Sequence, residues 1–172
     1  WGLRGIDQFG DSYFVTRIMN TGSTFRAVYR HDSSDNSLNL IYPEPGKILE
    51  GLTGFSSLNR DEDVVVLNDG TVFIRVSING STTGFWKREI GGEFVQLALM
   101  NEFTGTVTDE GIVGFRSVAV DFADWAVAED HTVFFTADVR NGVSGINQEG
   151  VWRIDPETKE VTTIARAPLD GK

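Results

Sequence analysis

The feature that most constrains the fold of this chain is an internal repeat with a period of about 60 residues. The segment 68–80 (NDGTVFIRVSING) parallels 129–142 (EDHTVFFTADVRNG), and a weaker copy, 10–22 (GDSYFVTRIMNTG), lies upstream. Self-similarity at a fixed period indicates a repeat protein, in which each copy is one supersecondary unit that stacks on its neighbours. We therefore expect three repeats in a single domain spanning 1–172, with approximate bounds 1–47, 48–108 and 109–172.

Aromatic residues recur at fixed places in these copies. One aligned set of phenylalanines comprises Phe14, Phe73 and Phe134. A second set pairs an aromatic residue with a base and comprises Tyr29-Arg30, Trp86-Lys87 and Trp152-Arg153. Large side chains repeated at one structural position predict packing between units more readily than a ligand site.

Each copy carries the pattern of four β-strands. In the second copy, 64–67 is a short apolar run and 71–78 is rich in β-branched and aromatic residues, which favour strands. Strands at 84–90 and 93–100 follow, separated by turns at Asn79-Gly80 and Gly91-Gly92. The third copy predicts the same four strands, at 124–128, 132–139, 150–155 and 160–166. No segment shows a helical period, so we expect almost no helix.

This pattern predicts an all-β fold of three four-stranded antiparallel repeats that resemble propeller blades. The segment VWRI at 151–154 lacks a clean polar face, which is expected of a sheet covered on both sides by its neighbours. The blades would be part of, or would assemble into, a β-propeller. The alternative is a β-trefoil, which also has three four-stranded repeats, although the long linkers 42–62 and 100–123 fit that fold less well.

Several of these residues also carry a family resemblance. The matching residues are Pro45-Gly46, just before the second copy, and Phe55, the run 68–73 (NDGTVF) and the run 84–86 (GFW) within it. The chain thereby resembles an uncharacterised bacterial repeat family with the pattern DG-x-V-x-F…G-x-W in each blade. That resemblance implies propeller blades and an extracellular or cell-surface location. It supplies no functional residue, and the third copy departs from the pattern by placing His131 where the turn glycine is expected.

Three blades are fewer than the four to eight of most closed propellers. We therefore expect the chain to be a piece or a processed form of a longer protein, or to complete a ring or filament between copies. An unpaired blade edge favours association with another chain.

Composition excludes several classes of function. The formal net charge of −10 argues against nucleic acid as a partner, because binding phosphates needs a basic surface. No apolar run is long enough for insertion into a membrane. The absence of cysteine excludes disulfides, thiolate nucleophiles and cysteine-ligated metals.

Residues capable of catalysis or metal binding are sparse. His131 occupies a predicted turn, and His31 lies beside Asp32 in a polar turn segment. Acidic pairs and runs occur, but calcium needs six to eight oxygen ligands and no calcium-loop motif is present. We predict no cofactor and assign no catalytic, cofactor or metal residue, with calcium as the alternative. The acidic clusters are Asp32/Asp35, Asp61-Glu62-Asp63, Asp109-Glu110 and Asp121/Asp124.

The sequence favours a non-enzymatic, extracytoplasmic binding or structural module with an unknown ligand or protein partner. Two alternatives stay open: a self-assembling homo-oligomer that completes a ring or filament between chains, and a glycan-active or other hydrolytic enzyme. The long linkers predict the candidate ligand face, because they enter the first strands of the blades. Its residues are Phe55, Asp61, Asp63, Phe122, Asp124 and Trp125.

Overall fold

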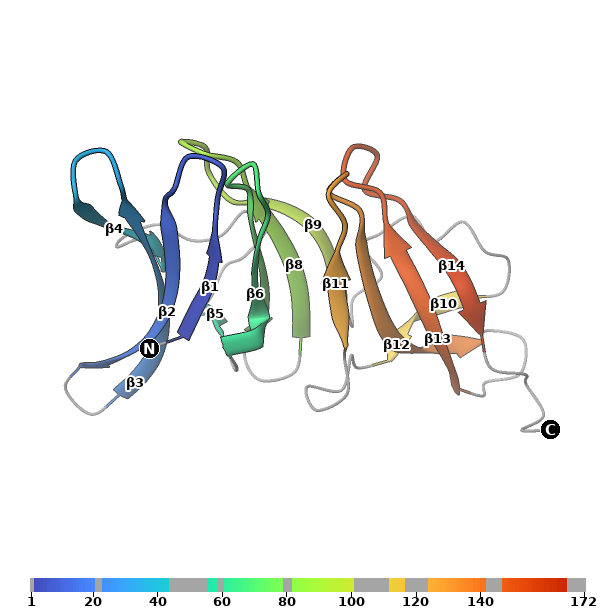
Figure 1. The fold of residues 1–172 in the computed structure, drawn as a ribbon. Coiled ribbons are helices and arrows are strands. Elements are labelled where there is room, and N and C mark those ends of the chain that lie inside the picture. The colour runs from blue at the N-terminus through green and yellow to red at the C-terminus, as the bar shows by residue number, and fades with distance from the viewer. Residues whose placement is uncertain are drawn as a thin grey trace. The chain divides into compact units, whose positions relative to one another are not determined.

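The described part of the chain forms three separate antiparallel sheets (Figure 1). The computed structural model describes residues 2–20, 23–43, 56–58, 61–78, 82–100, 112–116, 124–141 and 147–166. The only helical element among them is a three-residue 3-10 turn, η1 (Asp61–Asp63). No described helix is long and apolar enough to cross a membrane.

The first sheet is a simple meander. Its strand order is β1-β2-β3-β4, so each strand pairs with the next one along the chain. These strands are β1 (Gly2–Ile6), β2 (Ser12–Asn20), β3 (Ser23–Asp32) and β4 (Ser37–Tyr42).

The second and third sheets repeat this order, with one difference. In each, the first position is occupied by two short strands that pair with different parts of one long strand. The second sheet comprises β5 (Ser56–Ser57), β6 (Val64–Val66), β7 (Val72–Ile78), β8 (Thr82–Arg88) and β9 (Val95–Met100). The third comprises β10 (Ile112–Arg116), β11 (Trp125–Val127), β12 (Val133–Asn141), β13 (Asn147–Ile154) and β14 (Val161–Arg166).

The predicted fold class is confirmed: the protein is all-β, with three antiparallel blade-like repeats of four strand positions each. The strands predicted in the second and third copies are all present. The expectation that 42–62 and 100–123 are linkers throughout is wrong, because β5 and β10 lie within them. Both are short and lack a period-2 pattern, and they form by pairing with the far ends of β7 and β12.

The pattern of strand pairing also distinguishes the blade-like fold from the alternative β-trefoil fold. Among the described residues, the strands of each meander pair only with strands of the same meander. A trefoil would instead join strands of different repeats in one barrel. The observed pairing therefore favours the blade.

The tight turn between the first and second strand positions fixes the alignment of the copies. Its two backbone hydrogen bonds recur three times with N–O distances of 2.9–3.1 Å, and its fourth residue has a positive φ in every copy. These residues are Gly10 (+87°), Gly70 (+82°) and His131 (+70°). The prediction that His131 occupies a turn position with unusual φ is confirmed.

This alignment shifts the first copy by one residue, so the expected equivalence of Phe14 with Phe73 and Phe134 is wrong. Counting from the turn, Tyr13 is equivalent to Phe73 and Phe134, whereas Phe14 is equivalent to Ile74. Both residues of the pair Tyr13-Phe14 are aromatic, so the sequence alone offers two registers. The choice matters, because a shift by one residue moves a side chain to the opposite face of a sheet.

The second aromatic set keeps its predicted equivalence. Phe14 lies opposite Tyr29 in the first sheet, and Phe135 lies opposite Trp152 in the third. We call the faces of the three sheets that carry this set the Tyr29, Trp86 and Trp152 faces. The opposite faces are the Tyr13, Phe73 and Phe134 faces.

The middle sheet carries fully buried apolar side chains on both faces. Phe73 and Ile74 are adjacent in β7 and point to opposite faces, yet both are completely buried. Trp86 and Trp152 are also completely buried, and Trp152 Nε1 donates to the carbonyl of Ala137 at 3.2 Å. A continuous apolar strand is the pattern of a sheet that has a layer packed on each side.

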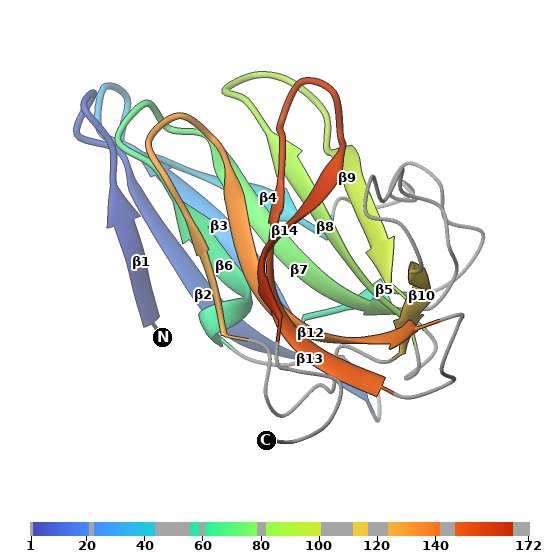
Figure 2. The ribbon, with the colours of Figure 1, turned by 90° about the vertical axis from the view of Figure 1, so that its right-hand side faces the viewer.

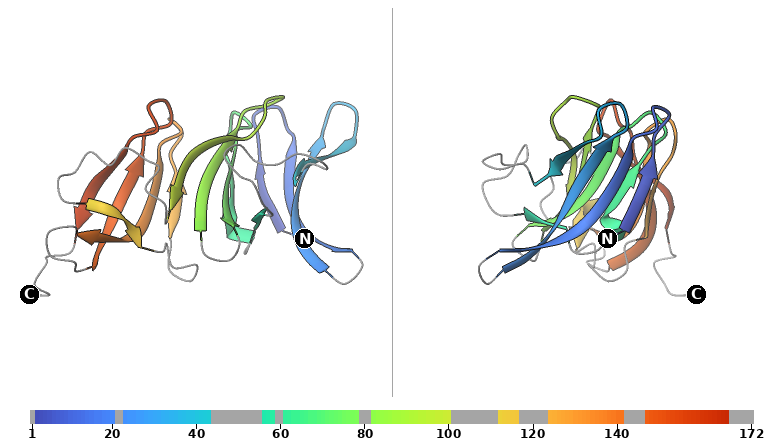
Figure 3. Two further views of the ribbon diagram at one scale, coloured as in Figure 1. Left: turned by 180° about the vertical axis from the view of Figure 1, so that it is seen from behind. Right: turned by 60° about the vertical axis from the view of Figure 1, so that its left-hand side comes forward.

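By compactness the strands fall into two units, and the candidate site lies in the first. That unit comprises Trp1–Asn79 and Phe85–Gln96 and contains the first sheet and most of the second. Its turns β1–β2, β3–β4, β6–β7 and β8–β9 lie at one end of the strands (Figure 2). The view from behind in Figure 3 shows β7 and β8 of the second sheet.

The shared turn allows a matched pair of substitutions. Replacing His131 with Gly should raise the free energy of unfolding by up to about 1 kcal/mol, because a left-handed backbone strains a residue that has a Cβ. Replacing Gly70 with Ala should lower it by at least about 1 kcal/mol. A Cβ at Gly70 would lie 2.5 Å from Ile90 Cδ1 and 2.9 Å from Asp7 Oδ2. Urea unfolding followed by tryptophan fluorescence measures both changes, and a loss of stability in His131→Gly would contradict the argument.

Candidate functional site

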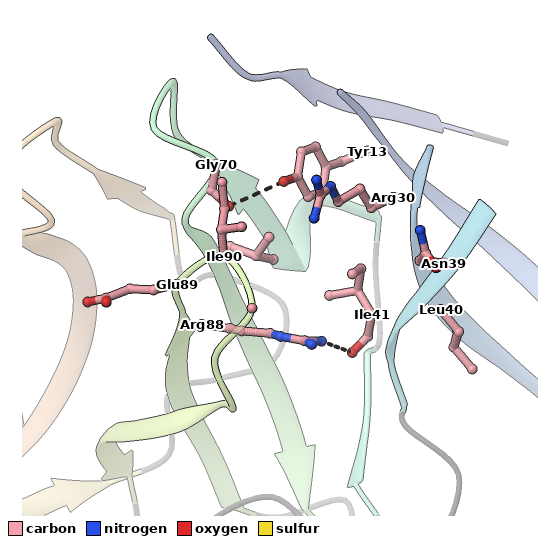
Figure 4. A pocket seen from close by; sticks show the side chains of 11 residues that line it. Tyr13, Arg30, Asn39, Leu40, Ile41, Gly70, Arg88, Glu89 and Ile90 are labelled. Carbon is pink, nitrogen blue, oxygen red and sulfur yellow. Dashed lines mark hydrogen bonds between the residues drawn. The ribbon is translucent and has the colours of Figure 1, made fainter. Parts of the chain in front are cut away.

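A polar cleft of about 530 Å³ lies within the first unit, between the first two sheets (Figure 4). It opens near the end of the strands that carries the tight turns. The first sheet contributes the start of β2, the end of β3 and part of β4, and the second contributes the start of β7, two turns and the end of β8. The lining residues are Tyr13, Arg30, Asn39, Leu40, Ile41, Gly70, Val72, Arg88, Glu89, Ile90 and Gly91.

The inner side of the cleft is built on Asp7, which caps the β1–β2 turn. Its Oδ1 accepts hydrogen bonds from the backbone N–H groups of Phe9 (2.9 Å) and Asp11 (3.0 Å). Its Oδ2 accepts the Tyr13 hydroxyl at 3.1 Å, and that hydroxyl also lies 3.4 Å from the carbonyl oxygen of Gly70. Tyr13 therefore joins the first sheet to the turn of the second, as the dashed line in Figure 4 shows.

Arg30 lines the cleft as part of an ion network. Its guanidinium contacts the carboxylates of Asp11 and Asp32, with both Nε and Nη2 directed at Asp11 Oδ2. The other oxygen of Asp11 accepts the backbone N–H and the hydroxyl of Ser33, at 2.8 and 3.1 Å. This network fixes the end of β3 against the β1–β2 turn.

The environment shifts the pKa of Asp11 and of Tyr13 in opposite directions. The backbone N–H of Ser33, together with Arg30, holds the pKa of Asp11 below its usual value, although burial acts in the opposite direction. Burial and the neighbouring Asp7 carboxylate raise the pKa of the Tyr13 hydroxyl far above its usual value. Tyr13 is therefore a neutral hydroxyl and Asp11 a carboxylate at neutral pH.

Arg88 spans the outer side of the cleft. Its Nη1 donates to the carbonyl of Ile41 at 3.0 Å and its Nε to that of Gly92 at 2.8 Å. The guanidinium carbon lies 5.7 Å from the centre of the Phe94 ring, and this ring packs edge-on against Tyr42. One long side chain thus connects β8 of the second sheet to β4 of the first (Figure 4).

The spacing of the two sheets differs between their two edges. At the β1–β6 edge they come so close that a Cβ added to Gly5 would lie 3.0 Å from Val66 Cβ. Beside them, the backbone N–H of Gln8 donates to the carbonyl of Asn68 at 2.7 Å. At the other edge a full arginine side chain is needed to bridge the gap. The sheets therefore diverge outward from their first strands, as propeller blades do.

These groups suit recognition better than proton transfer. An arginine cannot act as a base at neutral pH, and the Tyr13 hydroxyl keeps its proton. Glu89 is exposed, and its carboxylate lies 3.4 Å from Lys87 Nζ. The cleft presents hydrogen-bond donors in positions that the surrounding network fixes.

The residues predicted as a ligand face do not coincide with this cleft. Phe55 and Phe122 lie outside the described residues, and of Asp61 only the backbone, in η1, is described. Asp124 is exposed and its carbonyl accepts the backbone N–H of Thr136 at 3.0 Å. Trp125 is half-buried in β11. A ligand role for these residues stays a prediction.

The Asp63 carboxylate forms an ion pair with another residue of the protein. It is 2% exposed, and its Oδ1 accepts Nε of Arg75 at 2.8 Å and also contacts Nη2. Arg75 is likewise buried, in the middle of β7. This ion pair connects η1 to β7.

The two histidines occupy turns or their borders. His31 lies in β3, and its Nε2 is 2.8 Å from Asn36 Oδ1 in the β3–β4 turn. Of the acidic clusters considered for calcium, Asp109-Glu110 and Asp121 lie outside the described residues. Within the part of the chain that is described, no group of three or more His, Cys, Asp or Glu side chains is placed to hold a metal ion.

The sequence held few signals for the cleft. Asp7, Asp11 and Arg30 are ordinary polar residues near turns, and Arg88 follows a repeated aromatic-base pair by one position. Their convergence depends on contacts between residues up to 57 positions apart, such as that of Tyr13 with Gly70. The repeated turn could have indicated that one turn packs on the next.

Comparison of the chain with models of known protein families gave no match, and comparison with curated proteins gave none either.

Replacing Asp11 with Asn should destabilise the protein most at neutral pH. The carboxylate has a lowered pKa in the fold, so its contribution is present above its unfolded pKa of about 4 and is lost as the pH falls further. The difference between the midpoints of thermal unfolding of wild type and variant should therefore be largest near pH 7 and should shrink below about pH 4. Glu157→Gln removes the same charge from an exposed turn and serves as control. A difference independent of pH would contradict this role.

Replacing Asp63 with Asn should lower the free energy of unfolding by about 3 kcal/mol, because the buried Arg75 would lose the carboxylate that pairs with it there. Asp124→Asn removes the same charge from an exposed position and should change stability by less than about 0.5 kcal/mol. Chemical denaturation of both variants measures the difference. Equal effects would show that the buried pair contributes little to stability.

Proposed function

We propose that this chain is a non-enzymatic binding module built from propeller-type blades, and that it acts outside the cytoplasm. The observation that supports binding is the cleft of the first unit, where Tyr13, Arg30 and Arg88 are held by protein partners. The extracytoplasmic location is supported by the resemblance of the repeats to a secreted or surface-anchored family.

The chemistry of the cleft favours a small polar ligand that carries hydroxyl or carboxylate oxygens. Two guanidinium groups line it, and Asn39 adds an exposed amide at its rim. Fixed donors bind such oxygens at a low entropic cost, because the protein side chains are already ordered before the ligand arrives. A volume of about 530 Å³ lies within the range of small-molecule sites.

This proposal is tested by titrating the 15N-labelled protein with sodium glucuronate and, separately, with glucose. We expect saturable shifts of the backbone amide signals of Tyr13, Arg30, Gly70 and Gly91, larger with glucuronate because two arginines face the cleft. Asn39→Ala should weaken the binding several-fold. Ser34→Ala, in an exposed turn outside the cleft lining, should leave it unchanged. Shifts confined to other regions, or none with either probe, would contradict binding of this ligand class at the cleft.

A further inference from the structure

The Tyr29 face of the first sheet exposes large apolar side chains. Leu3 and Ile6 of β1 are both 57% exposed, and Leu38 of β4 is 53% exposed. Strand register places all three on this face, because Leu3 lies opposite Phe14, Ile6 opposite Ser12 and Leu38 opposite His31. The right-hand view of Figure 3 brings the first sheet forward.

One equivalent position in each of the other two sheets is fully buried, and the equivalents of Ile6, Val66 and Val127, are half-buried. Val64 corresponds to Leu3, since it lies opposite Ile74, and it is 3% exposed. Val161 corresponds to Leu38, since it lies opposite Ile154, and it is 1% exposed. The repeat therefore places apolar residues at these positions for burial, and in the first sheet they face solvent.

The contact between the first two sheets shows what covers such a face. The Tyr13 face of the first sheet packs on the Trp86 face of the second, through Gly5 against Val66 and through the backbone hydrogen bond from Gln8 to Asn68. A face of the Tyr29 type is thus covered by a face of the Tyr13 type from the preceding blade.

The third sheet presents a face of that covering type to solvent. On its Phe134 face, Val151 is 37% exposed and Arg153 is exposed, and Ile164 at the β13–β14 bulge is 50% exposed. The position equivalent to Val151 in the first sheet is Val28, which is completely buried. The chain therefore carries one uncovered face of each kind, on different sheets.

We propose that copies of this chain associate head-to-tail, with the Tyr29 face of the first sheet of one copy packed on the Phe134 face of the third sheet of another. The contact repeats the packing of the first two sheets. The backbone N–H of Glu129 in one copy then donates to the carbonyl of Gln8 in the next, as Gln8 donates to Asn68 within the chain. Such a contact is heterologous, so it propagates into a ring or a filament.

Charge modulates this association. Each copy carries a formal net charge of −10, so copies repel one another at low ionic strength. The contact itself is largely apolar and is not weakened by salt. Association should therefore strengthen as salt screens the long-range repulsion.

Sedimentation velocity of the purified chain tests the proposal. We expect a mass above the 19.0 kDa of a single copy that increases with protein concentration, and increases further when sodium chloride is raised from about 0.05 to 0.5 M. A chain that stays at 19.0 kDa at every concentration up to the millimolar range in high salt would overturn the proposal.

Two single variants test the heterologous geometry. Leu38→Lys disrupts only the Tyr29 face and Ile164→Lys only the Phe134 face, so each alone should be monomeric. An equimolar mixture should form a species of two chains and no larger one, because one intact face of each kind remains. Met19→Lys changes an 86% exposed residue on the opposite face of the first sheet and should associate like the wild type.

Circular dichroism and thermal unfolding confirm that the variants are folded, which is expected because the replaced side chains are at least half exposed. If Leu38→Lys were monomeric while Ile164→Lys still associated, two Tyr29 faces would be pairing with each other. That result would overturn the head-to-tail arrangement. A mixture that stays monomeric would also overturn it. Neither result bears on ligand binding in the cleft, which the Asn39→Ala titration tests separately.

Discussion

A sheet that is apolar on both faces needs a covering layer on each face, and the structure of this chain follows from that requirement. The neighbours Phe73 and Ile74 point in opposite directions and are both completely buried. An isolated four-stranded sheet could not bury both, since one face would remain in water. Repetition meets part of this requirement, because the Tyr13 face of the first sheet packs on the Trp86 face of the second.

Several aspartates of the described residues fix the turns between strands. Asp69 and Asp130 each accept the backbone N–H two residues ahead, and Asp155 accepts those of Glu157 and Thr158. Such hydrogen bonds favour the charged carboxylate and lower the pKa of Asp130 and Asp155. The spacing of aspartates that cap Asx-type turns can therefore resemble the spacing of calcium ligands. Asp35 is an example: it belongs to a cluster considered for calcium, and it accepts a hydrogen bond from the backbone N–H of Ser37.

The repeat, the strands and the turns were predictable from the sequence because each depends on residues close together in the chain. The Gly91 turn, with a φ of +73°, and the capping role of Asp155 are of this kind. Prediction failed where a choice depended on distant contacts. The register of Tyr13 and Phe14 is decided by a turn that the sequence pattern leaves ambiguous. The burial of Asp63 depends on Arg75, a charged residue inside a strand that is otherwise mostly apolar. The cleft could not be predicted at all, because it forms only when two repeats pack together.

The cleft follows from the divergence of the two sheets. Where their first strands meet, glycine at position 5 lets the backbones approach closely, and the turns share a hydrogen bond. Farther out, side chains must reach across a widening gap, and Arg88 does so by donating to the carbonyl of Ile41. Because this gap opens to water, charged and polar side chains line much of it, beside apolar residues such as Ile41 and Val72. The divergence of the first two sheets therefore creates a polar cleft beside an apolar core, and the same geometry that buries Trp86 also places Arg30 and Arg88 around a space of small-molecule size.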